Sequence, residues 1–201
     1  NGSEFLFFSG YSYLGLGACP AFKELVQEGL NRFGIVYPSS RISNTPLELY
    51  QQFETALATY TDTPATAAFS SGYLSARTAA EVVAATMPVF SLPHTHPASA
   101  AAPGVQALPA SVDWAAFFTH QLQQGVTQLA FAADTIYPTP GWINDFQFLH
   151  QVPEALQVTL LLDDSHGAGW MGQPGQSIHE RLQLPQQIDV LLHFSMSKAF
   201  H

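Results

Sequence analysis

Two lysines occur in the 201-residue sequence, and one of them stands in an unusual place. Lys198 follows the apolar run Val190–Phe194, whereas Lys23 lies among polar neighbours in a segment with helical spacing. A lysine amine can attack a carbonyl carbon, yet near its reference pKa of about 10.4 it is mostly protonated and a poor nucleophile. Chemistry at Lys198 therefore depends on the groups that lie beside it.

Polar residues follow the other apolar runs as well. Asp163–Gly167, with two carboxylates and a histidine, comes directly after Val158–Leu162, the most apolar run of the chain. A carboxylate at the end of a buried strand costs free energy unless it meets a cation or hydrogen-bond donors. Similar polar groups follow the remaining runs: Ser70–Gly72, His94–His96, Asp134 and Ser195–Lys198.

Short apolar runs alternate with segments of helical periodicity, which is typical of a parallel sheet buried on both faces. We therefore predict a three-layer α/β/α sandwich with a mainly parallel sheet. Ligands of such sheets gather beyond the carboxyl ends of the strands, so the polar residues should meet at one edge. The predicted strands are Ala65–Phe69, Val89–Leu92, Gln128–Ala132, Val158–Leu162 and Val190–Phe194.

Proline, glycine and capping residues mark the ends of the predicted helices. One helix begins at Pro20 and ends at Gly34, and another runs from Ser111 to Gln124 before Gly125. Thr45–Glu48 resembles a capping box that would open a helix containing Leu47, Tyr50, Phe53, Leu57 and Tyr60. A further helix should begin near Tyr73, and Pro93–Pro103 should form a loop or an irregular helical turn.

Other motifs allow different chemistry. Gly167–Gly172 matches the dinucleotide fingerprint G-x-G-x-x-G, but the following Gln173–Gly175 would break the helix that the fingerprint should open. Ser195–Lys198 matches S-x-x-K of acyl enzymes, without the S-D-N and K-T-G tripeptides that accompany it. His94 and His96, or Asp163 and His166, could ligate a metal ion, although we expect no metal.

Charge and composition exclude several functional classes. The net charge of −9 offers no basic stripe for nucleic acid. Cys19 is the only cysteine, so an internal disulfide or a multi-cysteine metal site cannot form. Phe5–Phe8 is a short apolar run, and none approaches the ~20 residues that span a bilayer. We expect no membrane association and a reducing compartment, most simply the cytoplasm.

Several motifs together resemble the α-oxoamine synthase family of fold-type I pyridoxal-phosphate enzymes. Asp163–Gly167 is similar to that family's D-[DE]-[AS]-H-G, and Ser195–Phe200 is similar to [ST]-x-[SG]-K-[AG]-[FL], about 30 residues later. This pair in this order is specific. Further matching segments are Tyr13–Leu16, Glu54–Ala58 and Phe69–Tyr73, so the resemblance covers nearly the whole chain.

The resemblance implies a role for each matched residue. Lys198 would hold pyridoxal 5′-phosphate as a Schiff base and act as the general base at the substrate's α-carbon. Asp163 would pair with the pyridine nitrogen, and His166 would hydrogen-bond the phenolic oxygen. His96 would stack on the ring, with His94 as the second candidate. The phosphate would be bound by Ser71, Gly72, Tyr73 and Ser195, and Asp134 would face the cofactor pocket.

The implied reaction is the decarboxylative condensation of an amino acid with an acyl-CoA, in a homodimer similar to 8-amino-7-oxononanoate synthase. An aminotransferase of the same fold, or an inactive fragment with a structural or dimerising role, is the alternative. Tyr37–Asn44, Tyr50 and His201 depart from the family pattern. Family enzymes are about twice as long, which implies truncation after the Schiff-base lysine. Residues 1–45 would form an N-terminal segment and 46–201 an incomplete large domain without the C-terminal small domain.

Overall fold

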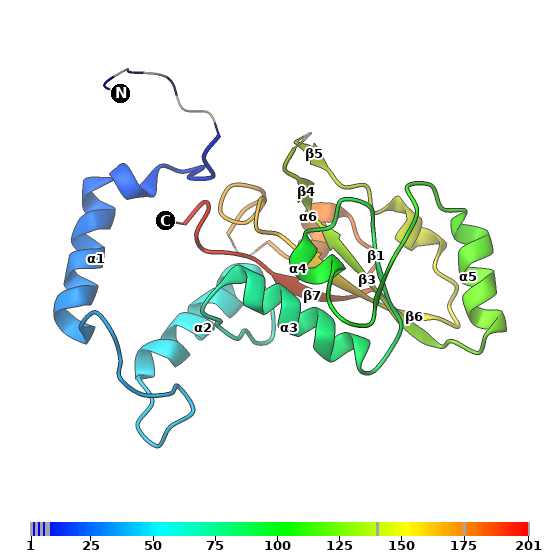
Figure 1. Cartoon of the computed structure of the whole chain (residues 1–201), viewed down its shortest axis with the longest axis horizontal. Helices are drawn as coiled ribbons and strands as arrows, with labels where there is room; N and C mark the ends of the chain where they lie inside the picture. Colours follow the sequence, from blue (N-terminus) through cyan, green and yellow to red (C-terminus); the bar gives the residue numbers. More distant parts are fainter. Residues whose placement is uncertain are drawn as a thin grey trace.

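A central parallel sheet organises the computed structural model, which describes residues 2, 4, 6, 9–139, 141–174 and 176–200. The departure at His201 and part of the run Phe5–Phe8 lie outside these residues. Five described strands pair in the order β2-β1-β3-β6-β7, and every pairing is parallel (Figure 1). The strands are β1 Val89–Ser91, β2 Val105–Ala107, β3 Gln128–Asp134, β6 Gln157–Asp163 and β7 Asp189–His193, and a small antiparallel hairpin joins β4 Ile136–Tyr137 to β5 Trp142–Ile143.

Helices cover both faces of this sheet. The α-helices are α1 Pro20–Phe33, α2 Glu48–Thr61, α3 Gly72–Ala84, α4 Pro97–Ala100, α5 Trp114–Gln123 and α6 Ile178–Leu182, with 3-10 turns η1 Leu16–Ala18 and η2 Gln147–Gln151. Figure 1 shows α3 lying against the sheet, while α1 stands apart from it at the far end of the molecule. Within the described part of the chain, no helix is long and apolar enough to cross a membrane.

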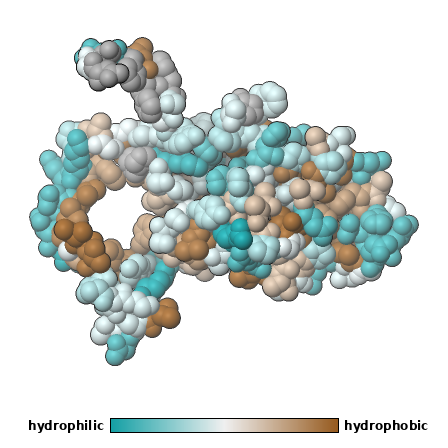
Figure 2. Space-filling model, in the orientation of Figure 1, coloured by the Kyte–Doolittle hydropathy of each residue, from teal (hydrophilic) through white to brown (hydrophobic). Residues whose placement is uncertain are grey.

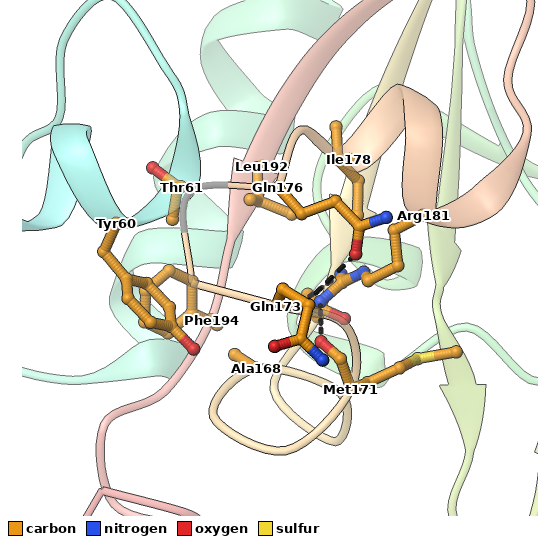
Figure 3. Close-up of a pocket in the computed structure, with 11 residues that line it drawn as sticks. Tyr60, Thr61, Ala168, Met171, Gln173, Gln176, Ile178, Arg181, Leu192 and Phe194 are labelled. Carbon is orange, nitrogen blue, oxygen red and sulfur yellow. Dashed lines mark hydrogen bonds and ion pairs between the residues drawn. The ribbon is translucent and has the colours of Figure 1, made fainter.

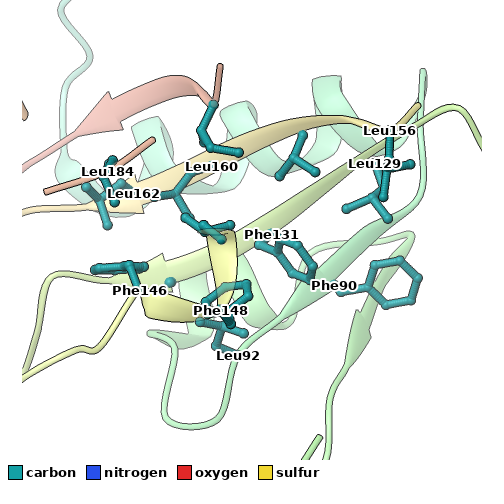
Figure 4. Close-up of a cluster of buried hydrophobic side chains, with 14 of the residues drawn as sticks. Phe90, Leu92, Leu129, Phe131, Phe146, Phe148, Leu156, Leu160, Leu162 and Leu184 are labelled. Atoms are coloured by element: carbon teal, nitrogen blue, oxygen red, sulfur yellow. The ribbon is translucent and has the colours of Figure 1, made fainter. Parts of the chain in front are cut away.

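The side chains of β3 show why the sheet is buried on both faces. Phe131 points into a core of aromatic and leucine side chains beside α5 and η2 (Figure 4), where the Trp114 and Phe148 rings stack with centroids 4.0 Å apart. On the other face, Ala130 and Ala132 are fully buried beneath α3. Because these side chains are small, α3 can approach the sheet closely. The predicted three-layer α/β/α fold is confirmed.

Most predicted elements match the observed ones. The structure has α1 between Pro20 and Gly34 as predicted, and α5 lies within the predicted helix Ser111–Gln124. The prediction of a capping box at Thr45–Glu48 is wrong. Leu47 occupies the N-cap position of α2, and no side chain caps this end of the helix. The strand β2 was not predicted, because three residues with partly exposed side chains carry no apolar run.

The predicted strand Ala65–Phe69 is also wrong. The segment joins no ladder, and a groove of about 700 Å³ separates it from β7, the edge strand of the sheet. Side chains satisfy its backbone instead, since Ala68 donates its N–H to Glu54 (2.6 Å) and accepts from Arg41 (2.8 Å). Burial alone would raise the pKa of Glu54. The N–H of Ala68 and the guanidinium of Arg41 stabilise its charged form and hold the pKa below the ordinary value.

The start of α3 depends on a side-chain cap. The Ser71 hydroxyl accepts a hydrogen bond from the N–H of Leu74 (3.1 Å). Replacing Ser71 with alanine leaves this N–H without its cap and should reduce the free energy of unfolding by about 1 kcal/mol. Urea denaturation would measure the change. The neighbouring Ser70→Ala variant is the matched control and should change stability by less than about 0.5 kcal/mol.

Candidate active site

Three adjacent strands end in a row of polar residues. Asp134 on β3 lies beside Asp163 on β6, and Asp163 lies beside His193 on β7, each pair being direct register neighbours. All three residues are buried, with at most 8% of their surface exposed. The parallel sheet therefore brings together, at its carboxyl edge, two carboxylates and an imidazole that are far apart in sequence.

Lys198 reaches this edge from the turn that follows β7. Its Nζ lies 3.0 Å from Nε2 of His166, and the other ring nitrogen, Nδ1, lies 2.6 Å from the hydroxyl of Tyr13. The Tyr11 ring contacts both partners, with Lys198 Nζ 5.8 Å from its centroid and His166 edge-on at 5.4 Å. The N-terminal segment thus orients the histidine that contacts the amine.

The charges at this edge are strongly coupled. Burial lowers the pKa of the Lys198 amine, although the charges of Asp163 and Asp134 oppose the shift. Burial and the charge of Lys198 lower the pKa of His166 to about 4, so its imidazole is neutral at pH 7. A half-buried amine with a lowered pKa is a better nucleophile than an exposed one, because a larger fraction of it is neutral.

Asp134 is the most perturbed carboxyl group of the row. Burial, and then the charge of Asp163, raise its pKa from 3.8 to about 7. Its Oδ1 accepts a hydrogen bond from the backbone N–H of His96 (3.0 Å), which ties the loop before α4 to the end of β3. At neutral pH the pair Asp134 and Asp163 therefore carries less than two full negative charges.

The raised pKa predicts a specific dependence of stability on pH. A carboxyl group with a folded pKa above its unfolded pKa favours folding at low pH and loses that contribution as the pH rises through the folded value. Asparagine at position 134 does not titrate. Between pH 5 and pH 8 the wild-type chain should therefore lose roughly 2 kcal/mol of stability relative to Asp134→Asn. Urea denaturation of both proteins at pH 5 and pH 8 tests this prediction. An equal change in the free energy of unfolding of wild type and Asp134→Asn would contradict it.

A close backbone contact joins the starts of α3 and of the lysine turn. A Cβ on Gly72 would lie 2.8 Å from Cβ of Ser195, so only glycine fits there. Ser165 holds this turn by accepting the backbone N–H of Ser195 (2.9 Å), and the hydroxyls of Ser195 and Ser197 lie 2.7 Å apart. Free N–H groups at the first turn of a helix attract anions, so this junction can bind a phosphate.

The remaining predicted residues surround the same edge. His96 is exposed and accepts the N–H of Ala98 at the start of α4, and its charge lowers the pKa of both His166 and His193. His94, with φ of 65°, turns toward Tyr137, at a centroid distance of 5.5 Å. Tyr73 is exposed on the first turn of α3. The structure thus brings His96, rather than His94, into the electrostatic neighbourhood of His166.

A buried ion pair supports the loop that carries His166. Arg181 Nη2 on α6 lies 2.5 Å from Oδ2 of Asp164, whose side chain is 2% exposed, and Nη1 donates to the carbonyl of Met171 (3.0 Å). Figure 3 shows Arg181 reaching from α6 toward Met171 and Gln176. The cavity beside this pair, about 20 Å³, has room for about one water molecule.

Some contributors could not be found from sequence alone. Tyr13 enters the sequence motifs only as part of Tyr13–Leu16, and no motif gives a role to Arg181 or Asp164. His193 lies within the apolar run Val190–Phe194, which gives no sign of a site. The Gly167–Gly172 segment forms consecutive turns and opens no helix, unlike a dinucleotide-binding loop. Among the described residues, no group of three His, Cys, Asp or Glu side chains is placed to hold a metal ion.

Known proteins are similar to this chain in sequence. No protein-family model matches the chain. An 8-amino-7-oxononanoate synthase from Lysinibacillus sphaericus is 26% identical over 207 aligned residues, which cover 99% of this chain and 52% of that protein. A second such synthase, from Pseudomonas savastanoi pv. phaseolicola, is 28% identical over 214 residues, which cover 100% of this chain and 52% of that protein. The chain therefore spans about half the length of the curated relatives it matches.

Solved structures show the same fold. Serine palmitoyltransferase from Sphingomonas wittichii has a TM-score of 0.83 and 19% sequence identity, over 99% of this chain and 51% of its own. A variant of serine palmitoyltransferase from S. paucimobilis, solved with a bound pyridoxal-phosphate–myriocin aldimine, has a TM-score of 0.76 and 19% identity over 94% of this chain and 50% of its own.

Proposed function

We propose that the chain belongs to the α-oxoamine synthase family of fold-type I pyridoxal-phosphate enzymes and is the cofactor-binding part of an acyltransferase. The proposed reaction is the decarboxylative condensation of an amino acid with an acyl-CoA, as in 8-amino-7-oxononanoate synthase. The observation that carries the proposal is the contact of Lys198 Nζ with His166 Nε2, 3.0 Å apart at the strand edge that also holds Asp163.

The residues present fit pyridoxal 5′-phosphate. A phosphate suits the first turn of α3, where a Cβ on Gly72 would clash with Ser195. A carboxylate suits a protonated pyridine nitrogen, and Asp163 lies at the end of β6, the strand that pairs with β7. When bound, this cofactor supplies an electron sink for a carbanion at the α-carbon of the substrate.

Each residue of the edge then has a distinct task. Lys198 would hold the cofactor aldehyde covalently and, once released, take the proton from the substrate's α-carbon. Asp163 would keep the pyridine nitrogen protonated. Neutral His166 would orient the phenolic oxygen and is itself oriented by Tyr13. Ser71, Tyr73 and Ser195 would complete phosphate binding, while His96 would stack on the ring and Asp134 would face the pocket.

We place the cofactor-binding domain at residues 46–201 and propose that the segment 1–45 contributes to a homodimer. No side chain of α1 is buried, and Leu25, Val26 and Leu30 form an exposed apolar stripe on it. Figure 2 shows hydrophobic atoms of this arm facing the opening between α1 and the rest of the molecule. A second copy could cover this stripe, and analytical ultracentrifugation of the chain measures its oligomeric state.

Adding pyridoxal phosphate to the folded chain tests the central proposal. An absorption band in the visible range, distinct from that of free cofactor, is the expected result. In the intact enzyme, addition of an amino acid and an acyl-CoA should release free CoA, whereas an aminotransferase would give an oxo acid without CoA. A folded chain that forms no band would contradict cofactor binding and favour the structural or dimerising role.

A further inference from the structure

His193 is a buried side chain that the proposed chemistry does not use. It is 5% exposed, and neither ring nitrogen has a hydrogen-bond partner among the described residues. Buried polar groups in folded proteins are nearly always hydrogen-bonded, and one without a partner reduces stability. An apolar residue would continue the run Val190–Leu192 without this cost. The position of His193 therefore requires an explanation other than packing.

Its ring lies directly beside Asp163. The two residues are register neighbours at the ends of β6 and β7, and Nε2 of His193 is 3.8 Å from Oδ2 of Asp163. This distance is too long for a hydrogen bond, but a shift of about 1 Å would close it. The other carboxylate oxygen, Oδ1, accepts the N–H of Ser165 at 2.9 Å. Asp163 is thus held on one side and faces the imidazole on the other.

The charges around His193 favour a neutral ring that donates one N–H. Burial is the main cause that lowers its pKa, and the charges of His96 and Lys198 lower it further, while Asp163 opposes them. Asp134 lies on the far side of Asp163 and repels its charge. A donor at His193 would offset that repulsion, because a hydrogen bond to a charged group stabilises it more strongly than one between neutral groups.

We propose that His193 is a positioning residue that donates its Nε2–H to Oδ2 of Asp163 and so holds this carboxylate toward the pyridine nitrogen of the cofactor. The proposal rests on the proposed function, which assigns the pyridine nitrogen to Asp163. Each carboxylate oxygen has two lone pairs, so Asp163 can accept from Ser165, His193 and the pyridinium together.

Nitrogen NMR of the histidine rings tests the contact in the chain without any cofactor. His193, identified by loss of its signal in His193→Gln, should be predominantly neutral above pH 7 with its proton on Nε2, because its pKa lies below the ordinary value. The Asp163→Asn substitution should lower its pKa and shift its ring signals. His179, which hydrogen-bonds the carbonyl of Ile188 (2.7 Å), is the internal control and should not respond. A proton on Nδ1, or no response to Asp163→Asn, would overturn the proposal.

Cofactor binding tests the consequence. The apparent Kd for pyridoxal phosphate, measured by absorbance, should rise about tenfold in His193→Leu. His193→Gln keeps an N–H donor and should restore most of the affinity. Equal affinity of wild type and His193→Leu would overturn the positioning role. If the wild-type chain binds no pyridoxal phosphate, the proposed function fails, and the NMR result alone then decides whether His193 holds Asp163.

Discussion

Replacing Lys198 with alanine should abolish the visible absorption band that the wild-type chain forms with pyridoxal phosphate. The band requires an amine that condenses with the cofactor aldehyde, and only Lys23 and Lys198 carry such side chains. The phosphate site proposed at the start of α3 does not include Lys198, so the variant should still bind the cofactor noncovalently. Activity in the intact enzyme should fall by several orders of magnitude, because both the covalent link and the proposed general base are lost.

Lys23→Ala is the matched control for this experiment. Lys23 lies on α1, where no side chain is buried, so its removal should leave the band unchanged. Borohydride reduction followed by peptide mass mapping then locates the cofactor on a single lysine. Cofactor found attached to Lys23, or an undiminished absorption band in Lys198→Ala, would contradict the assignment of Lys198. A normal circular dichroism spectrum of the variant ensures that the loss does not come from unfolding.

The strands that the sequence predicted correctly are those with partners on both sides or a strongly apolar run. β3 and β6 are buried on both faces, and apart from Thr159 their central residues, 129–133 and 158–162, are all Leu, Val, Ala or Phe. Ala65–Phe69 has a similar composition but no paired neighbour, and Arg41 and Glu54 bind its backbone instead. An apolar run therefore indicates the preference for a strand, while the tertiary neighbour decides whether a ladder forms.

The candidate site was predictable to the extent that it depends on strand order. Polar residues after β3, β6 and β7 had to meet, because parallel strands end at one edge. Sequence spacing could not show that Tyr13 would reach His166 across 153 positions, since that contact depends on how the N-terminal segment crosses the sheet edge. The pairing of His193 with Asp163 depends on the register of β6 and β7, which no local pattern specifies.

Arg181→Ala should destabilise the chain more strongly than loss of the Ser71 cap or of any exposed ion pair. Removal of Arg181 leaves the carboxylate of Asp164 buried without its cation, and breaking such a pair costs about 3–5 kcal/mol. The variant also loses the hydrogen bond to the carbonyl of Met171, so the turns after His166 lose their link to α6. Urea denaturation would give the free energy of unfolding, and a loss below about 1 kcal/mol would contradict the importance of the pair.

The pH dependence distinguishes the unpaired charge from a loss of packing. Burial already raises the pKa of Asp164, Arg181 opposes that shift, and the pKa should rise further in Arg181→Ala. A group with a folded pKa above its unfolded value loses its contribution to stability as the pH rises through the folded pKa. The deficit should therefore be larger at pH 8 than at pH 5, whereas a packing defect would be equal at both. Glu81→Ala, which removes the exposed partner of Arg77, is the control and should change stability little at either pH, because solvent screens such surface pairs.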